Sequence, residues 1–321
     1  TSPASPCTAI RAPAPASGTF ADVLPTQAAA REEILSYDVV VEVERDGWME
    51  VTEEIRVRVL GRDIRRGIYR DFPPSFPRAR GLGRVRAPFE VVRVLRDGEP
   101  EPYALESVGG PARRGGIRVR IGDANRLLEH GEHTYVLTYR TIRWIDFGEG
   151  RDRLYWNVTG NGWDFPILSV SARVVLPATV ALTDLGMRGW TGPEGATESE
   201  LATSFDPTYG GTGAAVFETT GRLAPREGLT FELTFPEGVV RPPTEEQLGR
   251  WFWLDWGPLV DTGLAVLAVL AVYVAFWYRV GRDPAEVELF AIQRDGRRGR
   301  RAARDHLPRV TDTQGHCHCR V

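Results

Sequence analysis

The densest group of side chains that could recognise a ligand lies in one short segment, residues 156–164. Two tryptophans there could stack on a sugar or a peptide, and amides and a carboxylate could hydrogen-bond to it. The candidate ligand-binding residues are Trp156, Asn157, Asn161, Trp163 and Asp164. The alternative interpretation is a tight glycine turn whose tryptophans fill the core of the domain.

Carboxylates near that segment offer a second kind of chemistry. Asp146, Glu149, Asp152 and Asp164 could supply a general acid and a general base if the fold brings two of them within a few ångströms. The sequence contains no nucleophile elbow, P-loop, dinucleotide fingerprint or zinc-protease helix. We therefore name no catalytic residue and no cofactor.

Two motifs have residue types that could bind a metal, but neither supplies a complete set of ligands: the spacing of His130 and His133 could offer two ligands, and no third is adjacent. His130 and His133 flank Gly131, and a hairpin turn before the next strand explains them without a metal. The run His316-Cys317-His318-Cys319 lacks the two-residue gaps that let paired ligands close around zinc. We therefore predict no metal site.

One carboxylate falls on the apolar face of a predicted strand. Apolar side chains alternate along residues 49–60, and Glu53 falls among them. A buried carboxylate needs a partner, and Arg70 is the best candidate because arginine stays charged and binds a carboxylate with two hydrogen bonds. We predict a structural Glu53–Arg70 ion pair. A bulge or edge position that leaves Glu53 in water is the alternative.

These residues belong to a region of short alternating strands with almost no helical periodicity. The candidate strands are residues 36–43, 49–60, 89–95, 117–121, 134–144, 154–158, 167–176, 215–220 and 229–235. Asp46-Gly47 and Asp97-Gly98 are typical hairpin turns. Strands this short favour an all-β fold, an antiparallel β-sandwich, over a membrane barrel.

An uncharged run from Thr262 to Tyr278 follows the strands, and with residues 257–261 it is long enough to cross a hydrocarbon core of about 30 Å as one helix. Tryptophans before the run, and aromatic and basic residues after it, match the two membrane interfaces. Arginines are more frequent after the run than before it, where only Arg241 and Arg250 stand nearby. We therefore expect a cytoplasmic C-terminus and a β domain outside.

The predicted organisation has five parts. They are a disordered or non-native segment 1–30, an extracytoplasmic β-sandwich 31–240, a linker and interfacial segment 241–256, a transmembrane helix 257–278 and a cytoplasmic tail 279–321. The composition changes abruptly after Phe290, and we expect residues 291–321 to be a dispensable, frameshifted or truncated end. The single cysteine of the outer part, Cys7, excludes an intrachain disulfide there.

The formal charge is divided unevenly along the chain. Residues 279–321 contain ten arginines against six acidic residues, so about −7 remains for the rest of a chain whose total is −3. An acidic outer domain argues against nucleic acid as its partner.

Short motifs along the chain carry a resemblance to a known family. They are Asp46-Gly47 with Val51-Thr52-Glu53, Gly67-Ile68-Tyr69-Arg70-Asp71-Phe72-Pro73, Ile121-Gly122-Asp123, Gly131-Glu132-His133-Thr134-Tyr135, Leu154-Tyr155-Trp156-Asn157-Val158-Thr159-Gly160 with Trp163, Leu223-Ala224-Pro225-Arg226-Glu227-Gly228-Leu229, and Gly281-Arg282-Asp283-Pro284. Through these motifs the chain resembles, from Glu33 to about Pro284, a bacterial family of membrane proteins, domain of unknown function 2207. The resemblance implies an exported β domain followed by membrane helices, with no established biochemical activity.

Together these patterns predict a single-pass β-sandwich that is anchored in the lipid bilayer and binds another envelope protein or a cell-wall component. An envelope enzyme or transporter accessory that uses the carboxylates near residues 156–163 is one alternative. A structural spacer is the other. A cleft joining Asp152 and Asp164 would favour the enzyme, and an exposed aromatic patch would favour binding.

Overall fold

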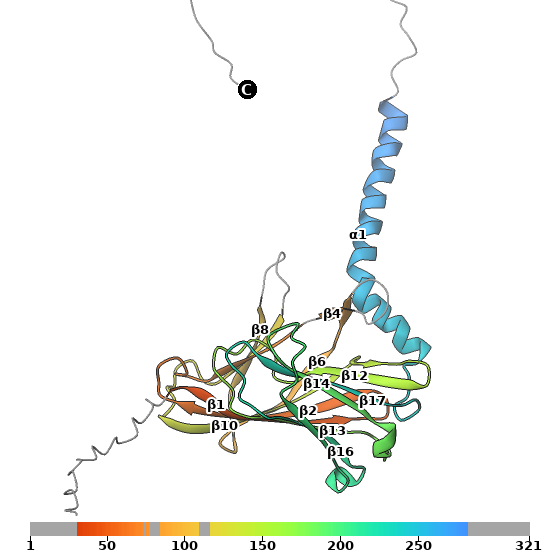
Figure 1. Cartoon of the computed structure of the whole chain (residues 1–321). Helices are drawn as coiled ribbons and strands as arrows, with labels where there is room; N and C mark the ends of the chain where they lie inside the picture. The colour runs from red at the N-terminus through yellow and green to blue at the C-terminus, as the bar shows by residue number, and fades with distance from the viewer. Residues whose placement is uncertain (1–30, 74, 78–83, 109–115, 282–321) are drawn as a thin grey trace, which may run out of the picture. The chain divides into compact units, whose positions relative to one another are not determined.

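The computed structural model describes residues 31–73, 75–77, 84–108 and 116–281. The predicted segment 1–30 and the tail from Arg282 on, including the His316–Cys319 run, lie outside the described residues. The described part consists mainly of β-strands followed by one long helix (Figure 1). The chain forms two compact units, one ending at Leu259 and one beginning at Val260.

An eight-stranded sheet forms one layer of the β domain. Its strands in spatial order are β15 (Leu201–Asp206), β16 (Ala214–Thr219), β13 (Val170–Val175), β1 (Glu33–Val43), β2 (Trp48–Val59), β10 (Gly131–Ile142), β6 (Phe89–Arg96) and β7 (Glu99–Pro100). Neighbours are antiparallel except β1 and β13, which run parallel. A parallel pair needs a long crossover connection, and the residues between these two strands supply it.

Two smaller sheets cover the large one. The first has the order β11 (Ile145–Asp146), β12 (Arg151–Asn157), β17 (Gly228–Pro236), β14 (Gly186–Gly192), and the second the order β3 (Ile68–Phe72), β9 (Gly116–Ile121), β8 (Tyr103–Val108). Figure 1 shows β12, β14 and β17 as a layer over β2 and β13. Phe231 of β17 stacks on Phe217 of β16 with ring centroids 4.7 Å apart, and Phe72 of β3 lies 4.9 Å from Tyr139 of β10. The domain is therefore a β-sandwich whose second layer is shared by two sheets.

The structure has a strand at each of the nine predicted positions, which confirms the all-β fold. It also has strands that the alternation did not predict: β3, β7, β8, β11, β14, β15, and a ribbon of β4 (Ser75–Pro77) with β5 (Arg84–Arg86). β14 was missed because three of its seven residues are glycines, which weaken the apolar alternation. β10 ends at Ile142, before the predicted end at Trp144, because Arg143 has a φ of 82°.

A buried carboxylate fixes the loop that follows β2. Glu32 is 7% exposed, and its two oxygens accept four backbone hydrogen bonds. The donors are the N–H groups of Leu60 at 2.8 Å, Arg62 at 3.1 Å, Asp63 at 2.6 Å and Ile64 at 3.0 Å. Burial alone raises the pKa of Glu32, but the four donors outweigh burial and hold the pKa below its usual value of 4.5.

Helix α1 (Glu245–Val280) follows the β domain and begins at a capping box. The Thr244 N–H donates to Gln247 Oε1 at 2.8 Å, and the Gln247 N–H donates to Thr244 Oγ1 at 3.3 Å. The helix therefore includes most of the predicted linker 241–256 as well as the predicted span 257–278.

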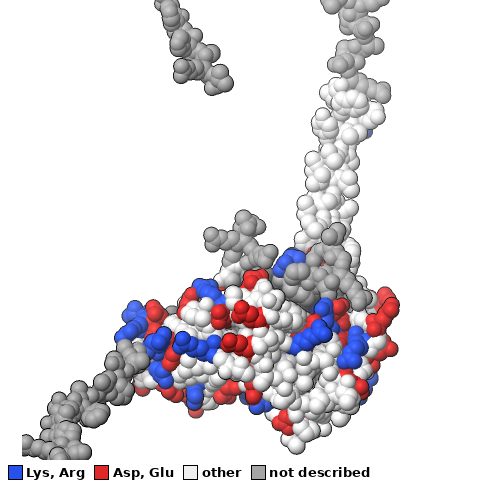
Figure 2. All heavy atoms as spheres, in the orientation of Figure 1, with Lys and Arg blue, Asp and Glu red and all other residues white. Residues whose placement is uncertain are grey.

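Helix α1 is a candidate membrane span by its length and composition. The mean hydropathy of its most apolar window is 2.2, and none of that window is buried. Figure 2 shows the helix as an almost entirely uncharged surface. At about 1.5 Å per residue its 36 residues extend over roughly 54 Å, more than a hydrocarbon core of about 30 Å. The turns that contain Glu245, Glu246 and Arg250 are therefore expected outside the hydrocarbon.

We expect Glu32→Gln to lower the free energy of unfolding of the fragment 31–240 by about 2 kcal/mol at pH 7, because a neutral amide binds the four N–H groups more weakly. The fragment should fold alone, since the buried apolar cluster consists of residues from Ile34 to Val240. A lowered pKa stabilises the fold above the unfolded-state pKa, so the advantage of the wild type should disappear as the pH falls through the folded-state pKa. Urea unfolding at pH 7 and pH 3 measures the free energy of unfolding of both proteins. An equal decrease in the exposed control Glu42→Gln would contradict a special role of the Glu32 hydrogen bonds.

Candidate functional site

Glu53 lies in the centre of the sandwich. Its strand, β2, is flanked on both sides, and Glu53 is paired with Val39 of β1 and Leu137 of β10 without a bulge. The side chain is completely buried, at 0% exposure. The edge or bulge alternative does not apply to this position, because the regular alternation of an interior strand directs the carboxylate into the core.

Arg70 of β3 and two tyrosines satisfy this carboxylate. Arg70 Nε donates to Glu53 Oε2 at 2.8 Å, and Nη2 donates to Oε1 at 3.0 Å. Tyr37 Oη donates to Oε2 at 2.6 Å, and Tyr139 Oη donates to Oε1 at 2.8 Å. Arg70 Nη2 also donates to the carbonyl oxygen of Val158 at 2.9 Å. The structure thus brings together Glu53 and Arg70, and each carboxylate oxygen accepts two hydrogen bonds.

The electrostatics of this network keep its protonation fixed. Burial raises the pKa of Tyr37 and Tyr139 well above 10, and the charge of Glu53 adds to the effect, so both hydroxyls remain donors. Burial alone would lower the pKa of Arg70, but Glu53 raises it above its ordinary value. The guanidinium also lies 4.5 Å from the ring centroid of Phe72. A closed network of this kind is suited to a structural role.

The tryptophans of the segment 156–164 are core residues. Trp156 is 3% exposed and Trp163 is 7% exposed. Trp163 Nε1 donates to the carbonyl oxygen of Thr159 at 2.9 Å, and its ring meets Tyr37 edge-on at 5.9 Å. The ring of Trp156 lies 4.6 Å from that of Trp144. This is the arrangement of the core-filling alternative, and neither indole face is open for stacking on a ligand.

The polar residues of the segment stay at the surface and stabilise its turn. The Gly160 N–H donates to Asn157 Oδ1 at 2.9 Å, and Asn157 Nδ2 donates to Asn161 Oδ1 at 2.9 Å. Asp164 forms an exposed ion pair with Arg226. Gly160 has a φ of 69°, and a Cβ there would lie 2.8 Å from Arg70 Nη1, so the turn needs glycine next to the buried pair.

The structure places the candidate acid–base residues in different environments. Asp146 pairs with Arg153 at 3.2 Å, and Glu149 is exposed in the turn before β12. Asp152 is buried on β12 opposite Phe235, whereas Asp164 is at the surface. Burial raises the pKa of Asp152, the Gly148 N–H lowers it, and the charges of Glu237 and Asp146 raise it further. The net effect is a raised pKa.

Hydrogen bonds at a turn explain the position of His133. Its ring pairs through Nδ1 with Asp97 Oδ2 at 2.7 Å, and its Nε2 donates to the Glu129 carbonyl oxygen at 2.9 Å. Because that carbonyl can only accept, Nε2 carries a proton in this arrangement. Among the described residues, no three or more His, Cys, Asp or Glu side chains form a group that could hold a metal ion.

A groove of about 660 Å³ lies within the first unit, where the β domain faces the N-terminal turns of α1. Its helix wall consists of Leu248, Trp251, Phe252 and Trp256, and its sheet wall includes Ile142, Ile145 and Phe147. Four charged residues complete it: Asp46, Arg143, Asp146 and Arg241. This volume lies within the range of about 300–1,000 Å³ that is usual for small-molecule sites.

A second buried ion pair holds the helix wall of the groove in place. Arg143 Nη1 and Nη2 donate to Asp255 Oδ1 at 3.0 Å and Oδ2 at 2.6 Å, and the two side chains are 5% and 1% exposed. The Arg86 N–H also donates to Asp255 Oδ1, at 3.1 Å. The guanidinium of Arg143 lies 4.8 Å from the ring centroid of Trp251. The sequence did not predict this groove, because segments from Asp46 to Trp256 contribute to it.

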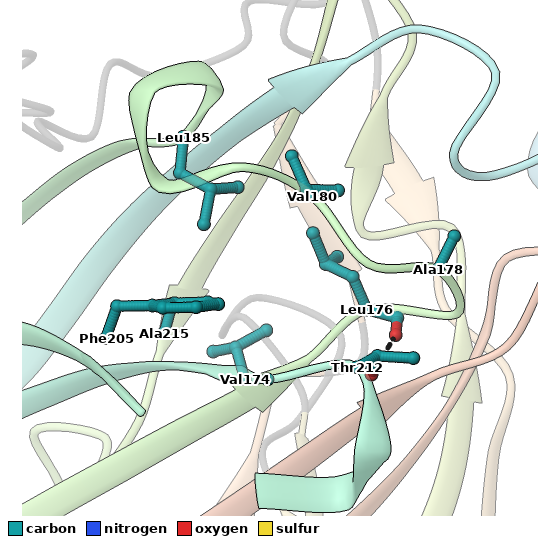
Figure 3. Close-up of a pocket in the computed structure, with 9 residues that line it drawn as sticks. Val174, Leu176, Ala178, Val180, Leu185, Phe205, Thr212 and Ala215 are labelled. Carbon is teal, nitrogen blue, oxygen red and sulfur yellow. Dashed lines mark hydrogen bonds between the residues drawn. The ribbon is translucent and has the colours of Figure 1, made fainter. Parts of the chain in front are cut away.

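A second cavity is too small to be a ligand site. Figure 3 shows its apolar lining, which includes Val174, Leu185 and Phe205, and the hydrogen bond of 3.0 Å from Thr212 Oγ1 to the Leu176 carbonyl oxygen. Its volume is about 10 Å³, room for one water molecule at most.

The fold and the apolar helix define a β-sandwich protein with one candidate membrane span at the C-terminal end of its described part. Residues 33–235 match the family described as predicted membrane protein (DUF2207), N-terminal domain, and the chain belongs to this family. It is also similar to the uncharacterized protein YciQ of Escherichia coli (strain K12), with 33% identity over 137 residues. That alignment covers 42% of this chain and 21% of the E. coli protein, so the chain matches about a fifth of that relative's length.

Two solved structures show a distant likeness. Yeast LTA4 hydrolase is 12% identical with a TM-score of 0.35, over 63% of this chain and 29% of that one. The M1 zinc metallopeptidase from Deinococcus radiodurans is 13% identical with a TM-score of 0.36, over 62% of this chain and 42% of that one. Likenesses at this level say nothing about function.

We expect Glu53→Leu and Arg70→Met each to lower the free energy of unfolding of the fragment 31–240 by about 4 kcal/mol, because each leaves a buried charge without its partner. The decrease in the free energy of unfolding of the double variant should be much smaller than the sum of the decreases in the two single variants. Urea unfolding of all four proteins gives the coupling energy. The neighbouring surface pair of Asp71 and Arg118 is the control. Asp71→Asn should lower the free energy of unfolding by less than about 1 kcal/mol. Additive losses at Glu53 and Arg70 would contradict a coupled pair.

The raised pKa of Asp152 predicts an unusual pH dependence. A raised pKa means that the carboxyl group stabilises the fold at pH values below its unfolded-state pKa and loses this contribution as the pH rises through the folded-state pKa. Asp152→Asn keeps an acceptor for the Gly148 N–H and should raise the melting temperature at pH 7, with the gain vanishing at pH 3. Thermal melts of the fragment 31–240 test this, with the exposed Asp184→Asn as control. A variant less stable than the wild type at pH 7 would show that the fold needs the charge.

Proposed function

We propose that this protein is a membrane-anchored binding module of the bacterial envelope, with its β domain outside the cytoplasm. The groove between the sheet edge and the start of α1 is the observation that carries the proposal. It combines a ligand-sized volume, a wall of aromatic side chains and charged residues from several segments, which are the usual properties of a binding site.

Rigid support for the groove strengthens this proposal. The helix wall is joined to the sheet by the buried pair of Arg143 and Asp255, and Arg86 of β5 donates to the same carboxylate. A recess held by a buried ion pair keeps its shape before a ligand arrives, so little conformational entropy is lost on binding. A mere spacer has no need of such a recess, and for this reason we favour the binding module over the structural alternative.

The proposed orientation rests on the distribution of arginines around α1. Arg279 closes the described helix, and further arginines follow it in the sequence, whereas Arg241 and Arg250 are the arginines closest before the apolar run. An excess of basic residues on one side of a span favours the cytoplasm for that side. The β domain would then face the periplasm or the cell exterior.

The enzyme alternative has less support. Asp152 faces the core and Asp164 pairs with Arg226 at the surface, so the two carboxylates named for acid–base chemistry do not share one environment. The raised pKa of Asp152 is compatible with a general acid, but a catalytic group must also reach its substrate.

We expect the full chain to resist carbonate extraction from membranes and a variant lacking residues 245–280 to be released, because α1 holds the apolar surface. Protease added to intact spheroplasts should digest residues 31–240, and the same epitopes in inside-out vesicles should be protected. Equal membrane retention of the deletion variant would contradict anchoring by α1. Protection in spheroplasts would reverse the orientation.

Binding in the groove is tested by a photo-cross-linking residue at Phe252, which lines the groove, against one at Trp253, the next residue on the helix, which does not. We expect cross-links in living cells from position 252 and none from position 253. The cross-links from position 252 should disappear in the variant Ile145→Trp, whose larger side chain fills the groove. Identical products at both positions would show nothing more than proximity to the membrane and would contradict a binding groove.

A further inference from the structure

We propose that the groove binds one phospholipid with an anionic headgroup, its acyl chain between the two apolar walls and its phosphate at the arginine rim. This inference rests on the proposed binding function and names the class of ligand. It follows from the position of the groove in the chain, the chemistry of its walls and the charge of its rim.

The position of the groove favours a lipid. Trp256, the last residue of the helix wall, precedes Thr262 by only six residues, and the uncharged run begins there. Tryptophans directly before an apolar span are typical of the membrane interface. Trp251, Phe252 and Trp256 therefore belong to the stretch of chain that is expected at the level of lipid headgroups, where lipid is the most concentrated ligand.

The walls have the chemistry that an acyl chain requires. Trp251, Phe252 and Trp256 on α1 face a lining that includes Ile142 and Ile145 of the β domain. Burial of methylene groups against such side chains is favourable by about 0.8 kcal/mol for each group in water, and tryptophan is enriched where apolar chains meet headgroups. Phe252 is half exposed, so this wall presents apolar surface that a ligand could cover.

The charge of the rim favours an anionic headgroup. Arg241 lines the groove, and its N–H donates to the carbonyl oxygen of Arg45 at 2.7 Å, which places the two exposed arginines next to each other. Among the described residues, neither guanidinium has an ion-pair partner. Of the other charges of the lining, Arg143 pairs with Asp255 and Asp146 with Arg153. One carboxylate, Asp46, thus stands against the two arginines. Asp46 accepts the Trp48 N–H at 3.3 Å within its turn. Arginine binds phosphate oxygens with paired hydrogen bonds.

Native mass spectrometry of the full chain tests the proposal. The chain is purified in a mild detergent and exchanged into mixed micelles with equimolar phosphatidylglycerol and phosphatidylcholine. We expect one phosphatidylglycerol to stay bound, with a preference of at least about tenfold over phosphatidylcholine. Arg241→Gln and Arg45→Gln should each reduce this preference by about fivefold, the effect of one arginine near an anionic lipid. The exposed Arg222→Gln is the matched control and should change nothing.

The aromatic wall is tested by a neighbouring pair of variants. Phe252→Gln should reduce lipid retention at least fivefold, whereas Trp253→Gln, which changes a somewhat more exposed aromatic side chain outside the groove, should not. Circular dichroism melts establish that each variant is folded. Equal losses in both variants, or retention without headgroup preference, would mean that the lipid is merely annular and would overturn the proposal. Competition by glycerol phosphate as strong as that by the whole lipid would also overturn it, because the acyl chain would then contribute nothing.

Lipid retention and photo-cross-linking together distinguish a failure of the lipid assignment from a failure of the proposed binding function. If no lipid is retained but photo-cross-linking at Phe252 captures a specific protein in cells, the groove is a binding site and the lipid assignment is wrong. If no lipid is retained and position 252 cross-links like position 253, both the lipid assignment and the binding function fail.

Discussion

A charged carboxylate in the middle of a sandwich imposes the strictest condition on this fold. Glu53 belongs to the eight-stranded sheet, Arg70 to the three-stranded sheet, and Val158, whose carbonyl oxygen also binds Arg70, directly follows β12 of the four-stranded sheet. One guanidinium therefore joins all three sheets. Because an unpaired buried charge is far more costly than a lost surface contact, arrangements that separate these sheets are strongly disfavoured. The glycine turn at Gly160 follows from the same condition, since a side chain there would displace the guanidinium. Apolar burial supplies most of the stability of such a core, while the ion pair specifies which faces meet.

The pair of Arg143 and Asp255 repeats this arrangement at the edge of the domain. There the carboxylate comes from α1 and the arginine from the residue that ends β10 with a positive φ. The unusual backbone conformation turns the chain out of the sheet and directs the guanidinium toward the helix. The two pairs differ in what surrounds them. Tyrosines and core residues close the first pair on every side, whereas the second stands beside an open groove. The same chemistry thus stabilises the core in one place and shapes the proposed binding surface in the other.

Sequence patterns predicted the parts of this structure that depend on neighbouring residues. The alternation along β2 placed Glu53 inside, and the uncharged run identified the apolar half of α1. Strands with glycine or few apolar residues, such as β14 and β15, were missed because their place in the sheets comes from tertiary packing. The tryptophans of the segment 156–164 had two possible environments, and no local pattern distinguishes a core indole from an exposed one. The groove could not be predicted from the sequence, since its lining residues are up to 210 positions apart, from Asp46 to Trp256.

The parallel pairing of β1 and β13 has a kinetic consequence. β1 is the first strand of the described residues, yet it lies in the interior of the eight-stranded sheet, and its partner Val170 is more than 130 residues away from Tyr37. During synthesis the hairpin of β1 and β2 emerges before β13, so one edge of β1 is unpaired until β13 arrives. Closing so long a loop makes folding slow, because entropy is lost before the contacts of the second half can compensate for it. A chain with this topology is open to aggregation, and to chaperones that protect exposed strand edges, until β13 has paired with β1.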